Sequence, residues 1–333
     1  QYSQNMQERI SELLVTPLNK NDKPHTILLV IGESASRDYM KAFNKEYKYD
    51  TTPWLDKMKE SKNFILFPNA FSIGANTVLA VSNAMTEINQ YNDKKFYNAC
   101  SIIDIAHAAG YKVHWYSNQG HLGSADTPVT LIANTADVAK WTKQELNQVQ
   151  YDESLLPYLE ELNPAKNNFL VVHLTGSHFN FLNRYPESFT KFSTPGKYDL
   201  EVNYADSIAY TDYVLEQIFN YAKDKLNLQA MVYFSDHATV PDKRRSPNFE
   251  GLASVRIPFF TYFADEYIAQ HQEVYDTLKK HENFYWTNDL AYELLCSIFD
   301  IKSNHFDEAN SLASESFKYK REDLRTNCGQ TRI

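Results

Sequence analysis

Five apolar runs bounded by turn-forming residues dominate the hydrophobic pattern of the chain. They are TILLVI at 26, YKVHWYS at 111, NNFLVVHL at 167, QAMVYF at 229 and PFFTYFA at 258. Continuous runs of this length are typical of strands buried on both faces. Helical spacing of apolar residues lies between or after them, in 101–110, 205–226 and from 287 onwards. Alternating strands and helices predict an α/β fold with a mostly parallel central sheet flanked by helices on both faces.

The N-terminal segment has a different pattern. Apolar residues Met6, Ile10, Leu13 and Leu14 predict one face of a helix, and the TPLNKNDKP segment that follows ends it. We therefore divide the chain into a lead-in helix and linker, residues 1–20, and a single domain, residues 21–333. No apolar run approaches the roughly 20 residues that a membrane-spanning helix needs.

Composition narrows the classes of function. The net charge of −9 argues against a nucleic-acid partner, because phosphate backbones are bound mainly through clustered Lys and Arg. The three cysteines, Cys100, Cys296 and Cys328, form no CxxC pair and allow at most one disulfide. That count leaves the redox compartment open.

Polar side chains appear where three of the predicted strands end. Glu33 follows the first run, Asp236 and His237 follow the fourth, and the third ends at His173 and leads to His178. Parallel strands place their carboxyl ends at one edge of a sheet, where ligands bind. Taken alone, Glu33 suits a helix N-terminus and His173 suits the core. Together, carboxylates and imidazoles from several strand ends favour a site for a zinc-like cation.

A candidate nucleophile lies in the stretch FSIGANTVLAVSNAMTEI, residues 71–88. Asn76 is a good N-cap, and Val78, Val81 and Met85 begin an apolar helical face, so Thr77 falls in the first turn. A phosphate held at that helix N-terminus would meet the Thr77 hydroxyl. Periodicity alone predicts only an ordinary threonine, and the hydroxyl needs a nearby dication to attack.

Five motifs then occur in a fixed order: VIGESASR, GANTVLAVSNAMT, HLTGSHFNFLNRYP, YADSIAYTDYVL and FSDHA. They resemble the lipid A phosphoethanolamine transferases of Gram-negative bacteria, in the sulfatase-like branch of the alkaline phosphatase superfamily, over roughly residues 25 to 301. The resemblance implies an alkaline phosphatase/sulfatase-like fold. It also implies transfer of phosphoethanolamine from phosphatidylethanolamine to a threonine, and from there to lipid A, a core oligosaccharide or a protein.

The resemblance also assigns roles, position by position. It makes Thr77 the nucleophile and implies one catalytic zinc, with a second, weaker zinc site left open. His178 and Asn118 would contact the transferred phosphoethanolamine, and His178 would move protons. The implied zinc ligands are Glu33, Thr77, Asp236 and His237.

Membership would further imply an N-terminal membrane domain that precedes these residues. The catalytic domain would face the periplasm at the inner membrane of a Gram-negative bacterium, and residues 1–20 would be the remnant of the connector. This part of the protein would be soluble by itself, and we expect a monomer that reaches the membrane surface through the missing domain.

Two departures from the family pattern concern substrate binding. The family usually has a second histidine about a dozen residues after its DHG motif; here DHA replaces it, and no histidine lies between His237 and His271. We expect Arg244 or Arg245 to take over its role. A lysine expected after the Trp-x-x-Asn stretch is missing, with His121 nearby. The ethanolamine ammonium needs acidic or aromatic neighbours, and the sequence does not single them out.

Three alternatives compete with this interpretation. A sulfatase would carry its nucleophile in a CxPxR or SxPxR motif after the first strand, which this chain lacks. A glycerolphosphate transferase of the lipoteichoic-acid synthase type, usually manganese-dependent, or a related metal-dependent phosphodiesterase, is the runner-up; the GESxSR and HLTGSH motifs favour phosphoethanolamine. A domain that only binds lipids or a partner is disfavoured, because every implied metal and nucleophile position is occupied.

Overall fold

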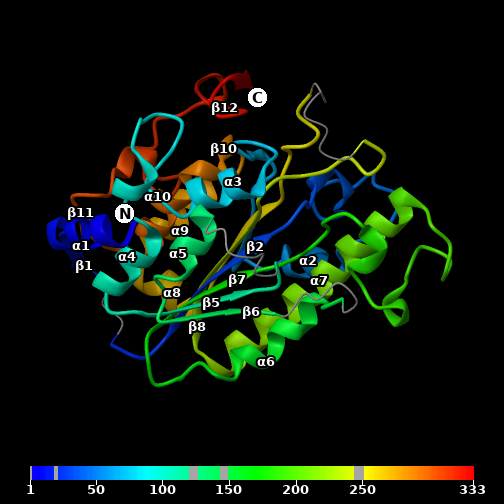
Figure 1. The fold of residues 1–333 in the computed structure, drawn as a ribbon, viewed down its shortest axis with the longest axis horizontal. Helices are drawn as coiled ribbons and strands as arrows, with labels where there is room; N and C mark the ends of the chain where they lie inside the picture. The colour runs from blue at the N-terminus through cyan, green and yellow to red at the C-terminus, as the bar shows by residue number, and fades with distance from the viewer. Residues whose placement is uncertain (1, 19–21, 120–126, 143–148, 244–250) are drawn as a thin grey trace.

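The central sheet lies between two layers of helices (Figure 1). The computed structural model describes residues 2–18, 22–119, 127–142, 149–243 and 251–333. Within these ranges seven strands pair in the order β3-β9-β8-β2-β7-β5-β6. Their bounds are β2 (Thr26–Gly32), β3 (Phe64–Leu66), β5 (Lys112–Ser117), β6 (Val138–Trp141), β7 (Asn168–His173), β8 (Leu228–Ser235) and β9 (Phe259–Phe263).

The predicted mostly parallel sheet is confirmed. Strands β8, β2, β7, β5 and β6 run parallel to one another. The two strands at one edge depart from this, because β9 pairs antiparallel with β8 and β3 pairs antiparallel with β9. The apolar run at 258 predicted the strand but contained nothing that indicated its direction.

Alternating side chains of β2 explain why its sequence is continuously apolar. Ile27, Leu29 and Ile31 join the core on one face, and Leu28 and Val30 join the core on the other. The first face is covered by α3 (Thr77–Ala84), α4 (Ile102–Ala108), α5 (Pro128–Ala133), α8 (Asp265–Gln270), α9 (Gln272–Lys280) and α10 (Ala291–Phe299). The second is covered by α2 (Pro53–Met58), α6 (Leu156–Leu159) and α7 (Leu200–Lys225).

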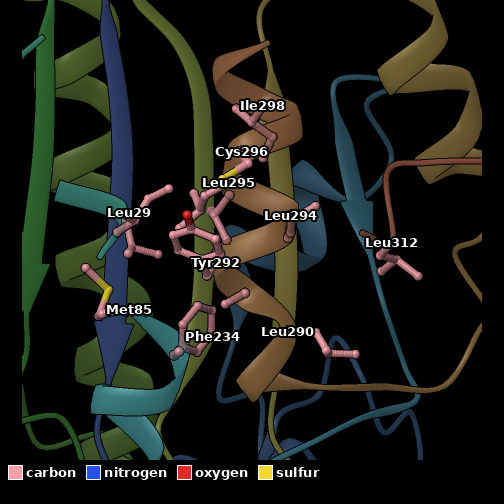
Figure 2. Close-up of a cluster of buried hydrophobic side chains, with 14 of the residues drawn as sticks. Leu29, Met85, Phe234, Leu290, Tyr292, Leu294, Leu295, Cys296, Ile298 and Leu312 are labelled. Atoms are coloured by element: carbon pink, nitrogen blue, oxygen red, sulfur yellow. The ribbon is translucent and has the colours of Figure 1, made fainter. Parts of the chain in front are cut away.

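Helix α10 anchors the layer that carries α3. Figure 2 shows Tyr292 and Leu295 of α10 facing Leu29 of β2 and Phe234 of β8, with Met85 beside them. All five side chains are buried. Each large apolar side chain buried in this way contributes about 1.5–3 kcal/mol to stability. Met85 caps the C-terminal end of α3, so this packing fixes the helix whose first residue is Thr77.

The long predicted helices are present, with shifted ends. Helix α4 begins at a capping box formed by Ser101 and Asp104, and Gly110 follows it with φ +90°. Helix α7 starts five residues earlier than predicted, at Leu200, because Asp199 caps it. The predicted helix from 287 is a short 3₁₀ turn followed by α10. At the N-terminus, α1 (Tyr2–Glu12) ends two residues before Leu14, the last residue of the predicted apolar face.

Helix α1 packs on the domain. Arg9 lies 3.3 Å from the Asp104 carboxylate, and both side chains are buried. The structure does not address the assignment of residues 1–20 to a connector, which stays a prediction. Among the described residues, no helix combines the length and apolar character needed to cross a membrane.

Short elements complete the fold, and sequence patterns of two or three residues are too brief to predict them. Three small ribbons pair β1 (Val15–Pro17) with β11 (Ile301–Ser303), β4 (Ala70–Phe71) with β10 (Trp286–Thr287), and β12 (Arg325–Thr326) with β13 (Thr331–Arg332). The 3₁₀ helices are η1 (Arg37–Tyr39), η2 (Phe96–Asn98), η3 (Asp152–Leu155), η4 (Phe181–Asn183), η5 (Glu187–Phe189), η6 (Asn288–Leu290), η7 (Glu308–Asn310) and η8 (Arg321–Asp323).

Candidate metal centre

Two neighbouring strands bring three potential metal ligands together. Strands β2 and β8 are parallel and in register at their ends, where Gly32 pairs with Ser235. The next residues, Glu33 on one side and Asp236 and His237 on the other, therefore emerge at the same edge of the sheet. One potential ligand atom from each of these three lies within 4.8 Å of the other two, and all three residues are fully buried.

Thr77 completes this group from a different element. The Asn76 side chain caps α3 by accepting a hydrogen bond from the Leu79 N–H, as the sequence predicted, and Thr77 is the first residue of the helix. Its Oγ1 donates to Glu33 Oε2 at 3.0 Å and lies 3.2 Å from His237 Nε2. The helix N-terminus faces the same space, where its N–H groups favour an anion.

The spacing of these atoms fits a metal ion. His237 Nε2 lies 3.2 Å from Glu33 Oε1, from Asp236 Oδ2 and from Thr77 Oγ1. One ring nitrogen cannot bond well to three oxygens at once, whereas ligand atoms about 2.0 Å from a tetrahedral zinc lie about 3.3 Å apart. Asp236 Oδ2 is buried without a hydrogen bond among the described residues. Two carboxylates, an imidazole and a hydroxyl form a donor set that suits zinc.

The tautomer of His237 also fits. Its Nδ1 lies 2.8 Å from the carbonyl oxygen of Ala238, which can only accept, so Nδ1 carries the proton. This leaves Nε2 directed at the carboxylates. Metal-bound histidines usually donate their second ring N–H to a carbonyl or carboxylate in this way, which fixes the ring orientation.

The electrostatics of the centre favour one added positive charge. Burial raises the pKa of Glu33, but the charge and hydrogen bond of His237 outweigh it and hold that pKa well below its usual range. Burial and the Glu33 charge raise the pKa of Asp236. Burial lowers the pKa of His237, but Asp236 and Glu33 raise it more, to about 10. The proton on His237 thus compensates the negative charge of the two carboxylates, as a bound cation would.

The tight loop of residues 175–177 packs against the backbone of Glu33. The buried Asp152 carboxylate accepts the N–H groups of Thr175 at 2.8 Å and Gly176 at 2.9 Å, and Ser177 N–H donates to the Glu33 carbonyl at 2.9 Å. Gly176 has φ +54°, and a Cβ there would lie 2.7 Å from the Glu33 carbonyl oxygen. Only glycine fits this approach.

The same loop positions His178. Its Nδ1 donates to the Phe179 carbonyl at 2.7 Å, so Nε2 is the atom that can exchange a proton with a ligand. His178 and Thr77 line one cavity of about 260 Å³, which we call the threonine cavity, together with Trp115, Trp141 and Ser117. This shared cavity brings the predicted nucleophile and the predicted proton carrier together.

Asn118 does not lie with them. Its side chain is fully buried, donates to Asp152 Oδ1 at 2.9 Å and accepts from Thr142, and it is not part of the cavity wall. The neighbouring Gln119 lines the cavity instead, and its Nε2 donates to Glu33 Oε2 at 3.1 Å and to the Leu174 carbonyl at 2.6 Å. The sequence placed an amide at this strand end but did not show which of two consecutive amides faces the site.

His173 is buried, as the sequence predicted for a core histidine, and it also forms part of the cavity wall. Burial lowers its pKa to about 4, so the ring is neutral. Three further residues considered in the sequence, His121, Arg244 and Arg245, lie outside the described residues.

Comparisons with known proteins show what this chain resembles. The family model described as Sulfatase matches residues 25–296. Phosphoethanolamine transferase EptC of Escherichia coli K12 is 30% identical over 272 residues, which cover 75% of this chain and 47% of that protein. Phosphoethanolamine transferase CptA of Salmonella typhimurium is 27% identical over 336 residues, which cover 90% of this chain and 55% of that protein. The chain thus spans about half the length of these relatives.

A solved structure shows the same fold. The C-terminal periplasmic domain of EptC from Escherichia coli, in complex with Zn, superposes with a TM-score of 0.80 at 23% identity. The alignment covers 92% of this chain and 90% of that domain. The alkaline phosphatase/sulfatase-like architecture that the sequence predicted is therefore confirmed.

Proposed function

The chain belongs to the sulfatase family, and on that premise we propose that it is a zinc-dependent phosphoethanolamine transferase with Thr77 as its nucleophile. One observation carries the proposal: Thr77 Oγ1, at the N-terminus of α3, lies 3.0 Å from Glu33 and 3.2 Å from His237. A nucleophile, a cation site and an anion-binding helix end thereby meet at one point. The names of the relatives support phosphoethanolamine as the transferred group.

Glu33, Asp236 and His237, with Thr77, would hold one zinc ion. Zinc bound there would lower the pKa of the Thr77 hydroxyl and neutralise negative charge on the phosphate. The related domain solved with Zn supports this choice of metal.

In the first half-reaction, Thr77 Oγ1 attacks the phosphorus of phosphatidylethanolamine and the P–O bond to diacylglycerol breaks. The threonine proton leaves along its hydrogen bond to Glu33 Oε2. His178 delivers a proton from Nε2 to the departing diacylglycerol oxygen, while its Nδ1–H stays on the Phe179 carbonyl. The N–H groups at the start of α3 stabilise the charge on the phosphoryl oxygens.

In the second half-reaction, an oxygen of the acceptor attacks the same phosphorus and the P–O bond to Thr77 breaks. His178 Nε2 takes the acceptor proton, which restores its starting state, and the proton held by Glu33 returns to Thr77 Oγ1 as the threonine leaves. The acceptor is lipid A or another glycan or protein of the cell envelope. We infer that the site faces the periplasm at the inner membrane, in a monomeric protein whose membrane-embedded part precedes the residues printed above.

The covalent intermediate provides the test. The zinc-loaded protein is incubated with phosphatidylethanolamine, digested, and the peptide that contains Thr77 is measured by mass spectrometry. We expect a mass gain of one phosphoethanolamine group, retained in Thr77→Ser and absent in Thr77→Ala. An adduct on Thr77→Ala would contradict the proposal, as would a glycerolphosphate adduct formed from phosphatidylglycerol in a parallel incubation when phosphatidylethanolamine gives none.

A further inference from the structure

A second cavity, of about 320 Å³, is lined in part by the segments that follow the candidate metal ligands in the sequence. Its wall includes Ser36 and Thr239, which follow Glu33 by three residues and His237 by two. It therefore lies against the loops after β2 and β8, whereas the threonine cavity lies against the ends of β5 and β7. The two cavities share no lining residue within the described part of the chain.

The wall of this second cavity carries aromatic rings, carboxylates and one basic side chain, that of Arg256. Tyr39 and Tyr47 contribute rings whose centroids are 5.2 Å apart, and Asp38 and Glu201 contribute carboxylates. Burial raises the pKa of Tyr39 to about 12, and Glu201 is the nearby acid that adds most to the shift. The phenols therefore stay neutral, and neutral aromatic rings beside carboxylates suit a cation.

Tyr47 supplies an independent indication of a ligand. The residue is only 9% exposed, and its hydroxyl is buried without a hydrogen bond to any described residue. A buried hydroxyl without a partner is costly, so such groups are uncommon in native structures. Burial raises its pKa, and Glu201 and Tyr39, both in the cavity wall, raise it further. Tyr47 is one of the residues that line the cavity.

The protein's own cations compensate this cavity only in part. Asp38 accepts a hydrogen bond from Arg256 Nε at 2.8 Å. Glu201 lies 3.4 Å from Lys48, but both side chains are about half exposed, at 45% and 58%. Exposed pairs of this kind contribute little and exchange readily. The Glu201 carboxylate is thus available to a charged ligand at the cavity rim.

We propose that this second cavity binds the primary ammonium group of a substrate. An ammonium carries one positive charge and three N–H donors. One N–H would be accepted by Tyr47 Oη and another by Glu201, while the Tyr39 ring packs against the adjoining carbon. The inference rests on the proposed transferase function for the source of the amine, which is the ethanolamine of the donor or an amino sugar of the acceptor. The binding itself does not depend on turnover.

The test is a titration of the zinc-loaded protein with ethanolamine, glucosamine and ethylene glycol, followed by ligand-observed NMR. Ethylene glycol matches ethanolamine in size but lacks the charge, so we expect the two amines to bind and the diol not to bind. Tighter binding of ethanolamine assigns the site to the donor, and tighter binding of glucosamine assigns it to the acceptor.

Two substitutions in the cavity wall test whether the amines bind in this cavity. Tyr47→Phe and Glu201→Gln should each weaken the binding of the preferred amine about tenfold, because each removes a hydrogen bond to a charged group. Tyr47→Phe should not lower the Tm, since the deleted hydroxyl has no partner among the described residues. Tyr49→Phe is the matched control: its ring lies 5.8 Å from that of Tyr47, outside the cavity wall, and binding should be unchanged.

Unchanged amine binding in both Tyr47→Phe and Glu201→Gln, or equal binding of ethylene glycol, would overturn the inference. The proposed function is tested separately, because amine binding is measured without catalysis. A protein that transfers phosphoethanolamine but binds no amine would refute the ammonium site alone. A Thr77→Ala variant that binds ethanolamine like the wild type supports it even where transfer is lost.

Discussion

Thr77 Oγ1 lies 3.0 Å from Glu33 Oε2, although the two residues are 44 positions apart in the chain. Glu33 is placed by the end of β2, and Thr77 by the first turn of α3. Each element is held by its own core contacts, so the distance between the two groups is set before any ligand arrives. Such preorganisation is what phosphoryl transfer requires, since the protein mainly positions groups and stabilises charge.

Zinc affinity should rise with pH. A cation must displace the proton of His237, whose pKa is raised to about 10 despite burial by Asp236 and Glu33. We expect the apparent Kd for zinc to fall about tenfold for each pH unit between about pH 6 and pH 8. Competition with a chromophoric chelator measures it, and a Kd independent of pH would contradict the charge state assigned to the centre.

Removal of the metal should change the pH dependence of stability. In the metal-free protein, the raised pKa of His237 contributes stability that is complete below its ordinary pKa of 6.5 and is lost as the pH rises toward 10. Zinc replaces that proton. The Tm difference between zinc-loaded and metal-free protein should therefore grow over this range, as measured by thermal denaturation in matched buffers. A constant difference would show that His237 does not exchange a proton for the metal.

Substitution of Gln119 should lower zinc affinity, and substitution of Asn118 should not. Gln119→Leu removes the 3.1 Å hydrogen bond to Glu33 Oε2, so zinc affinity should fall about 10- to 100-fold. Asn118→Leu instead leaves the buried Asp152 with one donor fewer and should cost about 1–3 kcal/mol of stability. Zinc binding and chemical denaturation of both variants separate the two roles. The opposite pattern would restore Asn118 as the residue of the site.

Gly176→Ala should disrupt the centre through a steric clash. The new Cβ would lie 2.7 Å from the Glu33 carbonyl oxygen, at φ +54°. Gly110→Ala is the matched control, because Gly110 has φ +90° and a Cβ added there would meet nothing within 4 Å. We expect the control to lose about 1–2 kcal/mol from backbone strain with normal zinc binding. Gly176→Ala should lose more stability and bind zinc poorly; equal behaviour of the two would contradict the close approach.

His178→Gln should separate proton transfer from metal binding. The imidazole lines the threonine cavity and lowers the pKa of Glu33 through its charge, but no hydrogen bond or ion pair among the described residues joins it to the three buried ligands. Transfer from phosphatidylethanolamine should slow about 10²- to 10⁴-fold while zinc content stays at the wild-type level. Metal analysis together with the rate of diacylglycerol release measures both. Loss of zinc in the variant would mean that His178 supports the centre rather than the chemistry.

The sequence by itself determined the fold class and singled out most residues of the candidate metal site. Apolar runs and caps are local signals, so the buried strands, the Asn76 cap and the Gly110 stop could be recognised along the chain. The ligand positions followed from a general rule, because residues after parallel strands share one edge of the sheet. Glu33, Asp236 and His237 lie together for that reason.

Only the tertiary structure decided which side chains face the ligand and where the second cavity forms. Gln119 and Asn118 are adjacent in sequence, and their different surroundings come from β7, Asp152 and Glu33, which are distant in the chain. The antiparallel edge formed by β9 and β3 likewise depends on long-range pairing. The ammonium cavity combines Ser36, Tyr47 and Glu201 from separate segments. Such a cavity exists only when packing brings these segments together, so no local pattern can predict it.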